Sequence, residues 1–280
     1  MIEVAIEAEE ELRDRIVALL GQLGFEGFWE DGPVLRSYIS ESRWTRAMPE
    51  EVERTVNLIT PSSRSTRPAI TTRRIQEENW NEEWEKTIRP IHVSERTVIT
   101  PSWHPYDAAP GELVLTIDPK MSFGTGYHES TRLILRLLEQ HIRTGDTVLD
   151  MGTGTGVLAI AAVRLGAADA TGVDVDEWSY DNACENIRLN HVEDRITILH
   201  GDITATPAGP FTLILANIQR TVLLEMLPLL VRRLRAEGRL LLAGLLHDDR
   251  DIMMEQLARE GMTLLNEVSE NEWIAIAARR

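Results

Sequence analysis

Hydrophobic and polar residues follow two periods in the first part of the chain. Ile2–Ala8 alternates apolar and polar residues, the pattern of a half-buried strand, and Glu10–Leu23 carries an apolar stripe of helical spacing. Two strands around a Gly-Pro turn, a second helix starting at Pro49 and a strand over 68–76 complete the segment. This β-α-β-β-α-β order predicts a small ferredoxin-like α+β domain over residues 1–76, in which we find no catalytic cluster.

From residue 91 onward, short apolar runs alternate with helical stripes. Strands are predicted at 91–102 and 113–117, and then at 148–151, 171–174, 196–200, 212–216, 239–243, 263–268 and 273–277. The last two strands are close enough to form an antiparallel hairpin. Residues 91–280 therefore read as an α/β domain with a doubly wound, seven-stranded, Rossmann-like sheet.

The segment that joins the two domains is rich in tryptophan and acidic residues. Trp80 and Trp84 are four residues apart, so they lie on one face if the segment is helical. We predict a linker helix over residues 77–90 whose tryptophans pack against a neighbouring domain.

Length and composition limit the class of protein. A chain of 280 residues accommodates one large and one small domain. No run of about 18 apolar residues occurs, so no membrane span is expected, and the acidic N-terminus lacks a signal-peptide pattern. Cys184 is the only cysteine, which excludes a disulfide within the chain and fits a reducing cytoplasm.

The charge is strongly acidic, with a formal net value of −16. Residues 77–280 carry 32 of the 45 acidic residues and 19 of the 29 basic ones, a net charge of −13. Direct binding of nucleic acid, which needs a basic surface, is not expected. The bias favours a basic partner, or reflects a salt-adapted host.

The central motif is a strand, a glycine turn and the start of a helix within residues 147–161. Its glycines, Gly152, Gly154 and Gly156, follow the spacing G-x-G-x-G, and Asp150 lies two residues before the first. Dinucleotide sites usually show G-x-G-x-x-G, and a carboxylate at this place would repel a pyrophosphate. The carboxylate of Asp150 suits S-adenosylmethionine instead, because it is able to accept hydrogen bonds from an ammonium group or from backbone amides. A structural turn or a nicotinamide site is the alternative.

Two further polar residues end strands of the predicted sheet. Asp174 follows Gly152 by 22 residues, the separation at which a carboxylate binds ribose hydroxyls. Asp176 reads as a helix N-cap. Asn217 lies at the carboxyl end of the strand over 212–216, where open α/β sheets bind their ligands.

A polar loop, Asp118–Thr131, precedes the glycine motif. It contains Phe123-Gly-Thr-Gly126 and His128, and we expect it either to lie over the cofactor or to provide a helix N-cap at Ser130 or Thr131.

Together these motifs resemble the bacterial ribosomal protein L11 methyltransferase family of class I protein-lysine methyltransferases. The resemblance is carried by Asp118-Pro119 with the 123–131 loop, by Leu149–Gly156, by Asp174 and by Ala216-Asn-Ile218, and it runs from about Trp80 to the C-terminus. The departures from the family pattern are mild. Lys120 stands in place of its glycine, Ser122 of an alanine, Ser130 of a threonine and Thr153 of a cysteine.

The resemblance implies a cofactor, S-adenosylmethionine, and a set of site residues. Cofactor contacts are expected from Thr131, Gly152, Asp174 and Asn217, and the loop and the glycine turn add Phe123, Thr125, Gly126, Asp150 and Gly154. Asn217 and His128 are the candidate catalytic residues, and no metal site is predicted. The implied substrate is basic ribosomal protein L11, held by the N-terminal domain, and we expect a monomer.

The chemistry requires a neutral amine as the nucleophile, whereas a free lysine has a pKa of about 10.4. A mostly apolar channel would lower that pKa, so that positioning provides most of the rate. His128 is either a proton relay to solvent or a structural hydrogen-bonding group.

Three alternative functions remain open at this level. A class I methyltransferase for another protein or a small-molecule amine shares all the motifs, although a small substrate leaves the N-terminal domain without a role. A non-catalytic ribosome-assembly factor would not need the full set of cofactor residues. A nicotinamide oxidoreductase is disfavoured by Asp150 and by the glycine spacing.

Overall fold

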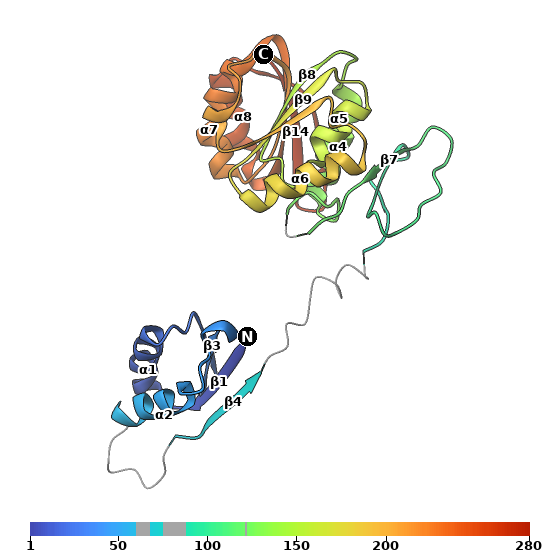
Figure 1. Cartoon of the computed structure of the whole chain (residues 1–280). Helices are drawn as coiled ribbons and strands as arrows, with labels where there is room; N and C mark the ends of the chain where they lie inside the picture. The colour runs from blue at the N-terminus through green and yellow to red at the C-terminus, as the bar shows by residue number, and fades with distance from the viewer. Residues whose placement is uncertain (60–67, 75–87, 121) are drawn as a thin grey trace. The chain divides into compact units, whose positions relative to one another are not determined.

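The computed structural model describes residues 1–59, 68–74, 88–120 and 122–280. The chain divides into two compact units, Met1–Trp84 and Glu85–Arg280 (Figure 1). Most of the predicted linker helix, with Trp80 and Trp84, lies outside the described residues and stays a prediction. Residues 88–90 of that range are described and belong to no helix or strand.

The smaller unit is a four-stranded antiparallel sheet covered by two helices. Its elements are β1 (Ile2–Glu7), α1 (Glu10–Gln22), β2 (Gly27–Asp31), β3 (Val34–Ile39), a 3-10 turn (Glu41–Arg43), α2 (Met48–Ile59) and β4 (Ile70–Arg74). The strand order is β2-β3-β1-β4. Ile2, Val4 and Ile6 of β1 are buried in one core with Ile16 and Leu20 of α1, as the two periods in the sequence predict. The ferredoxin-like fold is confirmed.

The larger unit contains the seven-stranded sheet. Its elements are α4 (Glu129–His141), β8 (Thr147–Met151), α5 (Val157–Arg164), β9 (Asp169–Asp174), α6 (Glu177–Leu189), β10 (Ile196–His200), β11 (Phe211–Asn217), α7 (Arg220–Arg233), β12 (Leu234–Leu246), α8 (Arg250–Arg259), β13 (Thr263–Glu270) and β14 (Trp273–Arg279), with 3-10 turns at Ile203–Ala205 and His247–Asp249. The strand order is β10-β9-β8-β11-β12-β14-β13. The first five strands are parallel, and β14 and β13 form the predicted antiparallel hairpin.

Helices cover both faces of this sheet, as Figure 1 shows with α7 and α8 on one side and α4, α5 and α6 on the other. Successive side chains of a strand enter different cores. Leu213 and Leu215 of β11 pack with residues of α4 and α5, whereas Ile214 and Ala216 pack with residues of α7. The central strand β11 is apolar over most of its length because both of its faces are buried.

The segment before α4 corrects one expectation. The predicted single strand over 91–102 is two antiparallel strands, β5 (Ile91–His92) and β6 (Thr97–Thr100), and β7 (Leu113–Thr116) runs parallel to β6. The chain turns at Ser94, whose Oγ accepts hydrogen bonds from the backbone N–H groups of Arg96 and Thr97, both at 3.0 Å. Such a side-chain turn competes with strand pairing and leaves no mark in the apolar pattern.

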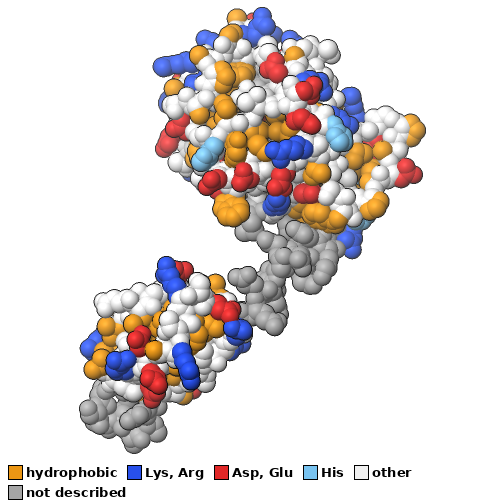
Figure 2. All heavy atoms as spheres, viewed as in Figure 1, with side chains coloured by type: hydrophobic (Ala, Val, Ile, Leu, Met, Phe, Trp, Pro, Cys, Tyr) orange, Lys and Arg blue, Asp and Glu red, His pale blue; other side chains and the backbone are white. Residues whose placement is uncertain are grey.

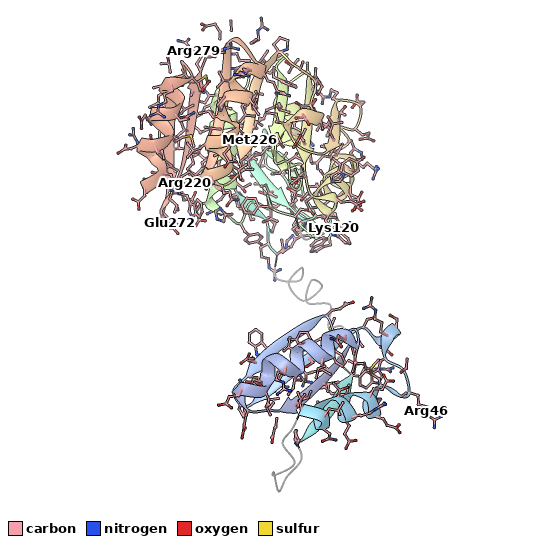
Figure 3. The ribbon with its side chains drawn as sticks, turned by 90° about the vertical axis from the view of Figure 1, so that its left-hand side faces the viewer. Arg46, Lys120, Arg220, Met226, Glu272 and Arg279 are labelled. Atoms are coloured by element: carbon pink, nitrogen blue, oxygen red, sulfur yellow. The ribbon has the colours of Figure 1, made fainter. Side chains whose placement is uncertain are left out.

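The order of the sheet reverses between β8 and β11, which creates a crevice at the carboxyl ends of the strands. Figure 3 shows Lys120, Arg220 and Glu272 at one end of this unit and Arg279, the last residue of β14, at the opposite end. No helix among the described residues is long and apolar enough to cross a membrane.

A buried ion pair lies near the amino ends of the central strands of the sheet. Asp146 and Arg239 are about 95% or more buried, and an Arg239 Nη2 lies 2.6 Å from Asp146 Oδ1. Asp146 also accepts hydrogen bonds from the Arg143 N–H and the Thr212 hydroxyl, each at 2.7 Å. A single carboxylate therefore connects the starts of β8 and β11 to Arg239 within β12.

Replacing Asp146 by alanine leaves the Arg239 guanidinium buried without its counter-charge. We expect Asp146→Ala to lower the free energy of unfolding by roughly 3–5 kcal/mol. Glu255→Ala is the matched control, because Glu255 pairs with Arg259 on the surface of α8, where ion pairs contribute little. Denaturant unfolding of both variants measures the difference, and equal losses would contradict the assignment.

Candidate active site

The crevice contains a cavity of about 610 Å³ at the carboxyl ends of the parallel strands. Its walls come from the glycine turn, from the ends of β9 and β11, from the segment after β10 and from one face of α7. The lining residues are Phe123, Met151, Gly152, Gly154, Asp174, Val175, Ser179, Asp202, Ile203, Asn217, Ile218, Gln219, Val222, Glu225 and Met226. Met226 marks the α7 wall in Figure 3.

The glycine turn can be made only by glycine. The φ angles of Gly152, Gly154 and Gly156 are +71°, +53° and +80°, values that side chains disfavour. Space is also limiting, because a Cβ atom on Gly154 would lie 2.2 Å from the carbonyl oxygen of Phe123. The backbone of the turn is therefore open to the cavity on one side and touches the 118–131 loop on the other.

Asp174 closes β9 at the wall of the cavity. Its Oδ2 accepts a hydrogen bond from the Gly154 N–H at 2.9 Å, and its Oδ1 accepts one from the Asp176 N–H at 3.1 Å. Asp176 caps α6 by accepting from the Ser179 N–H at 2.9 Å, as predicted. These bonds fix the Asp174 carboxylate, and each oxygen retains a lone pair for a further donor.

Asp150 lies beneath the turn and outside the cavity lining. It is completely buried, and its Oδ2 accepts hydrogen bonds from the Thr153 hydroxyl at 2.7 Å and from the Ala159 N–H at 3.2 Å. Of the two predicted partners, an ammonium group or a backbone amide, the structure shows the amide. Burial raises the pKa of Asp150 to about 7, although the bonds from Thr153 and Ala159 oppose the increase.

Residues 122–131 of the 118–131 loop, which the structure describes, lie against the glycine turn. The Thr155 N–H donates to the Phe123 carbonyl at 2.9 Å, and the Thr155 hydroxyl donates to the Gly124 carbonyl at 2.8 Å. The Phe123 side chain lines the cavity. Thr125 and Gly126 do not, and Gly126 packs against Ile99.

A second cavity of about 260 Å³ shares four residues with the first. Its lining residues are Phe123, His128, Ser130, Asn217, Ile218, Gln219, Gly244 and Trp273. Asn217 lies between the two cavities, and its Nδ2 donates to the hydroxyl of Thr131 at 3.2 Å. Thr131 is fully buried and lines neither cavity, so its contact with the site is through Asn217.

His128 is the N-cap residue of α4, a role that the sequence predicted for Ser130 or Thr131. Its Nδ1 accepts a hydrogen bond from the Ser130 N–H at 3.2 Å. Its ring stacks edge-to-face on Trp273, with the ring centroids 4.4 Å apart. Sequence reasoning favours hydroxyl caps, and imidazole caps are too uncommon to be inferred from the pattern.

Sequence analysis missed the wall formed by Val175, Ser179, Asp202 and Ile203. The available signal was the pair Gly201-Asp202 directly after β10, because a polar residue at the carboxyl end of a parallel strand lies at the ligand edge. Hydrogen bonds from the Thr204 hydroxyl and N–H lower the pKa of Asp202, which keeps this carboxylate ionised.

The strand order with its antiparallel hairpin, and the G-x-G-x-G turn at the reversal of the sheet, define a class I methyltransferase domain of Rossmann-like fold. The profile of the family described as "Ribosomal protein L11 methyltransferase (PrmA)" matches residues 2–280. The chain belongs to this family, as its motifs predict.

Relatives support this membership over nearly the full length. The chain is 37% identical to the ribosomal protein L11 methyltransferase of Chlorobaculum tepidum over 278 residues, 98% of this chain and 94% of the relative. It is 36% identical to that of Bacteroides fragilis, covering 95% and 94%. The crystal structure of the ribosomal protein L11 methylase from Lactobacillus delbrueckii subsp. bulgaricus matches with a TM-score of 0.65 and 29% identity, covering 69% of this chain and 99% of that one. The chain is thus an S-adenosylmethionine-dependent protein methyltransferase.

The close contact between Gly154 and Phe123 allows a test of whether the cavity binds the cofactor. Gly154→Ala places a methyl group against the Phe123 carbonyl, so we expect the affinity for S-adenosylhomocysteine to fall about tenfold or more. Gly145→Ala is the control, because Gly145 has a φ of +85° but nothing within 4 Å of its added Cβ. Calorimetric titration should show weaker binding only for the first variant; equal binding by both would refute the contact.

The raised pKa of Asp150 predicts a pH dependence of stability. Between the usual value of 3.8 and about 7 the folded chain retains a proton that the unfolded chain releases. The contribution of this group to stability therefore falls as pH rises through that window and is constant above it. Asp150→Asn removes the effect.

We expect the wild-type chain to lose stability relative to Asp150→Asn between pH 5 and pH 8. Thermal unfolding of both proteins at several pH values measures this difference. A difference that does not change with pH would show that Asp150 is ionised throughout.

Proposed function

We propose that the chain transfers methyl groups from S-adenosylmethionine to lysine ε-amino groups, and to the N-terminal α-amino group, of ribosomal protein L11. The observation that carries the proposal is the pair of adjoining cavities that share Phe123, Asn217, Ile218 and Gln219. One is large enough for a nucleoside cofactor, and the other is a small, mainly apolar recess that fits an alkylamine. Relatives of 36–37% identity carry the name of this activity.

The larger cavity provides groups for each part of the cofactor. We assign the Asp174 carboxylate to ribose hydroxyls, because its oxygens are fixed by two backbone N–H groups at the wall. The open backbone at Gly152 and Gly154 suits the amino-acid end. Val175, Asp202 and Ile203 provide apolar surface and an acceptor for a base with an exocyclic amine.

The bound cofactor supplies a methyl group on a positively charged sulfur. The chain has to present a neutral amine to it, and the smaller cavity supports this by burial against Phe123 and Trp273. Desolvation disfavours an ammonium ion and so lowers the pKa of an entering lysine. Holding the amine in line then supplies most of the acceleration.

Asn217 is the group that we assign to the amine. Its Nδ2 is engaged by Thr131, and its Oδ1 is buried without a partner among the described residues. A buried acceptor without a donor is costly, and an amine N–H in the smaller cavity would satisfy it. Asn217 would thus orient the nitrogen lone pair toward the larger cavity.

His128 fits a structural role better than a proton relay. Since its Nδ1 accepts from the Ser130 N–H, the neutral ring carries its proton on Nε2 and has no free lone pair for the amine. We assign His128 to fixing the start of α4 and the wall of the smaller cavity. The lysine therefore releases its proton to solvent as it enters the smaller cavity, before methyl transfer.

The domain predicted over residues 1–76, which lies within the smaller unit, is proposed to hold the protein substrate. Residues 77–280 have a net charge of −13, which complements a basic ribosomal protein. Figure 2 shows acidic side chains interspersed with basic ones on the displayed face of each unit. A small-molecule amine would leave the smaller unit without a role.

The decisive experiment is mass spectrometry of purified L11 after incubation with the chain and S-adenosylmethionine. We expect mass gains in steps of one methylene, absent with Asp174→Ala. If L11 gains no mass while S-adenosylmethionine still binds in calorimetry, the substrate assignment is wrong, and another amine or an assembly role replaces it.

A further inference from the structure

The strand that leads into the 118–131 loop has an unusual partner. One edge of β7 pairs with β6, and the Ile117 N–H continues that pairing by donating to the Thr100 carbonyl at 2.9 Å. Thr116 and Asp118 point their backbone groups the other way, because alternate residues of a strand use opposite edges. This second edge meets the side of α6 rather than another strand.

Asparagine side chains of α6 and its C-cap replace the missing strand. Asn190 accepts from the Thr116 N–H at 3.0 Å and donates to the Thr116 carbonyl at 2.6 Å. Asn186 accepts from the Asp118 N–H at 2.9 Å and donates to the Asp118 carbonyl at 3.2 Å. Asn182 donates to the same carbonyl at 2.9 Å, but it makes no bond to the glycine turn that the structure shows. The spacing matches, since four residues of a helix rise about 6 Å and two residues of a strand about 6.6 Å.

The two asparagines differ in their third hydrogen bond. Asn190 Nδ2 donates to the Asn186 carbonyl within the same helix, at 2.8 Å, whereas Asn186 bonds to a different segment. Its second Nδ2 hydrogen goes to the carbonyl of Thr155, at 2.9 Å, and Thr155 is the glycine-turn residue that binds the Phe123 and Gly124 carbonyls. The amide of Asn186 is completely buried, and both of its N–H groups and its oxygen are used. It thus joins the stem of the loop to the glycine turn.

We propose that Asn186 is a positioning residue that sets cofactor affinity by fixing the distance between the 118–131 loop and the glycine turn. It lines neither cavity, so it acts through Asp118 and Thr155 and touches no reacting atom. The loop contains Phe123, which lines both cavities. If the start of the loop at Asp118 were free to shift, Phe123 would move with it. The inference rests on the cofactor cavity and is independent of which amine is methylated.

Matched substitutions on the two asparagines test the proposal. Asn186→Ser and Asn190→Ser each remove three side-chain hydrogen bonds to backbone groups. Only the first removes the bond to the glycine turn. We expect Asn186→Ser to raise the dissociation constant for S-adenosylhomocysteine about tenfold or more, and Asn190→Ser to change it less than about threefold at a similar loss of melting temperature. Calorimetry well below the melting temperature gives both constants without a protein substrate.

Steady-state kinetics provides the second readout. For Asn186→Ser we expect the KM for S-adenosylmethionine to rise together with the dissociation constant for S-adenosylhomocysteine. The kcat at saturating cofactor should stay within about twofold of wild type. Asn186→Leu, which fills the space without hydrogen bonds, should behave alike. The proposal would be overturned by unchanged cofactor affinity in the Asn186 variants, or by an equal loss of affinity in the Asn186 and Asn190 variants. A failure of the chain to methylate L11 would not affect it.

Discussion

The site depends on the contact between two backbones, that of the loop at Phe123 and that of the glycine turn at Gly154 and Thr155. The Thr155 N–H reaches the Phe123 carbonyl at 2.9 Å only because no side chain intervenes at Gly154. This contact brings the wall that carries Phe123 to the end of β8. Asp174, Asn217 and Asp202 then surround one space, because they lie at the carboxyl ends of three parallel strands of the same sheet, β9, β11 and β10.

Polar groups buried around this contact act mainly on backbone atoms. Asp150 binds the Ala159 N–H below the turn, Thr155 binds the Gly124 carbonyl, and Asn186 binds Asp118 and Thr155. Each of these hydrogen bonds restricts the conformation of the turn or the loop, and none of these side chains places an acid or a base in the cavity. That distribution suits methyl transfer to a neutral amine, in which positioning and desolvation outweigh proton transfer.

Features set by neighbours in sequence could be predicted, and features set by distant contacts could not. The alternation in Ile2–Ala8 and the glycines at 152 and 154 fix local backbone geometry, so the strand, the turn and the fold class followed from them. The break in 91–102 could not be predicted, because it depends on a hydroxyl, that of Ser94, whose turn looks like any other polar position. The asparagine pairing with β7 spans some 70 residues of sequence and is visible only in the fold.

The placement of Thr131 shows why a motif can identify a residue without identifying what it does. The motif marks Thr131 as part of the cofactor set, yet the residue is fully buried and meets the site only through the Asn217 amide. In the structure this hydroxyl accepts from Nδ2, so the Asn217 Oδ1 is left without a partner among the described residues. A hydroxyl is also able to donate, so Thr131 by itself does not impose this orientation of the amide. The motif identifies Thr131, and the fold shows that its partner is the side chain that lies between the two cavities.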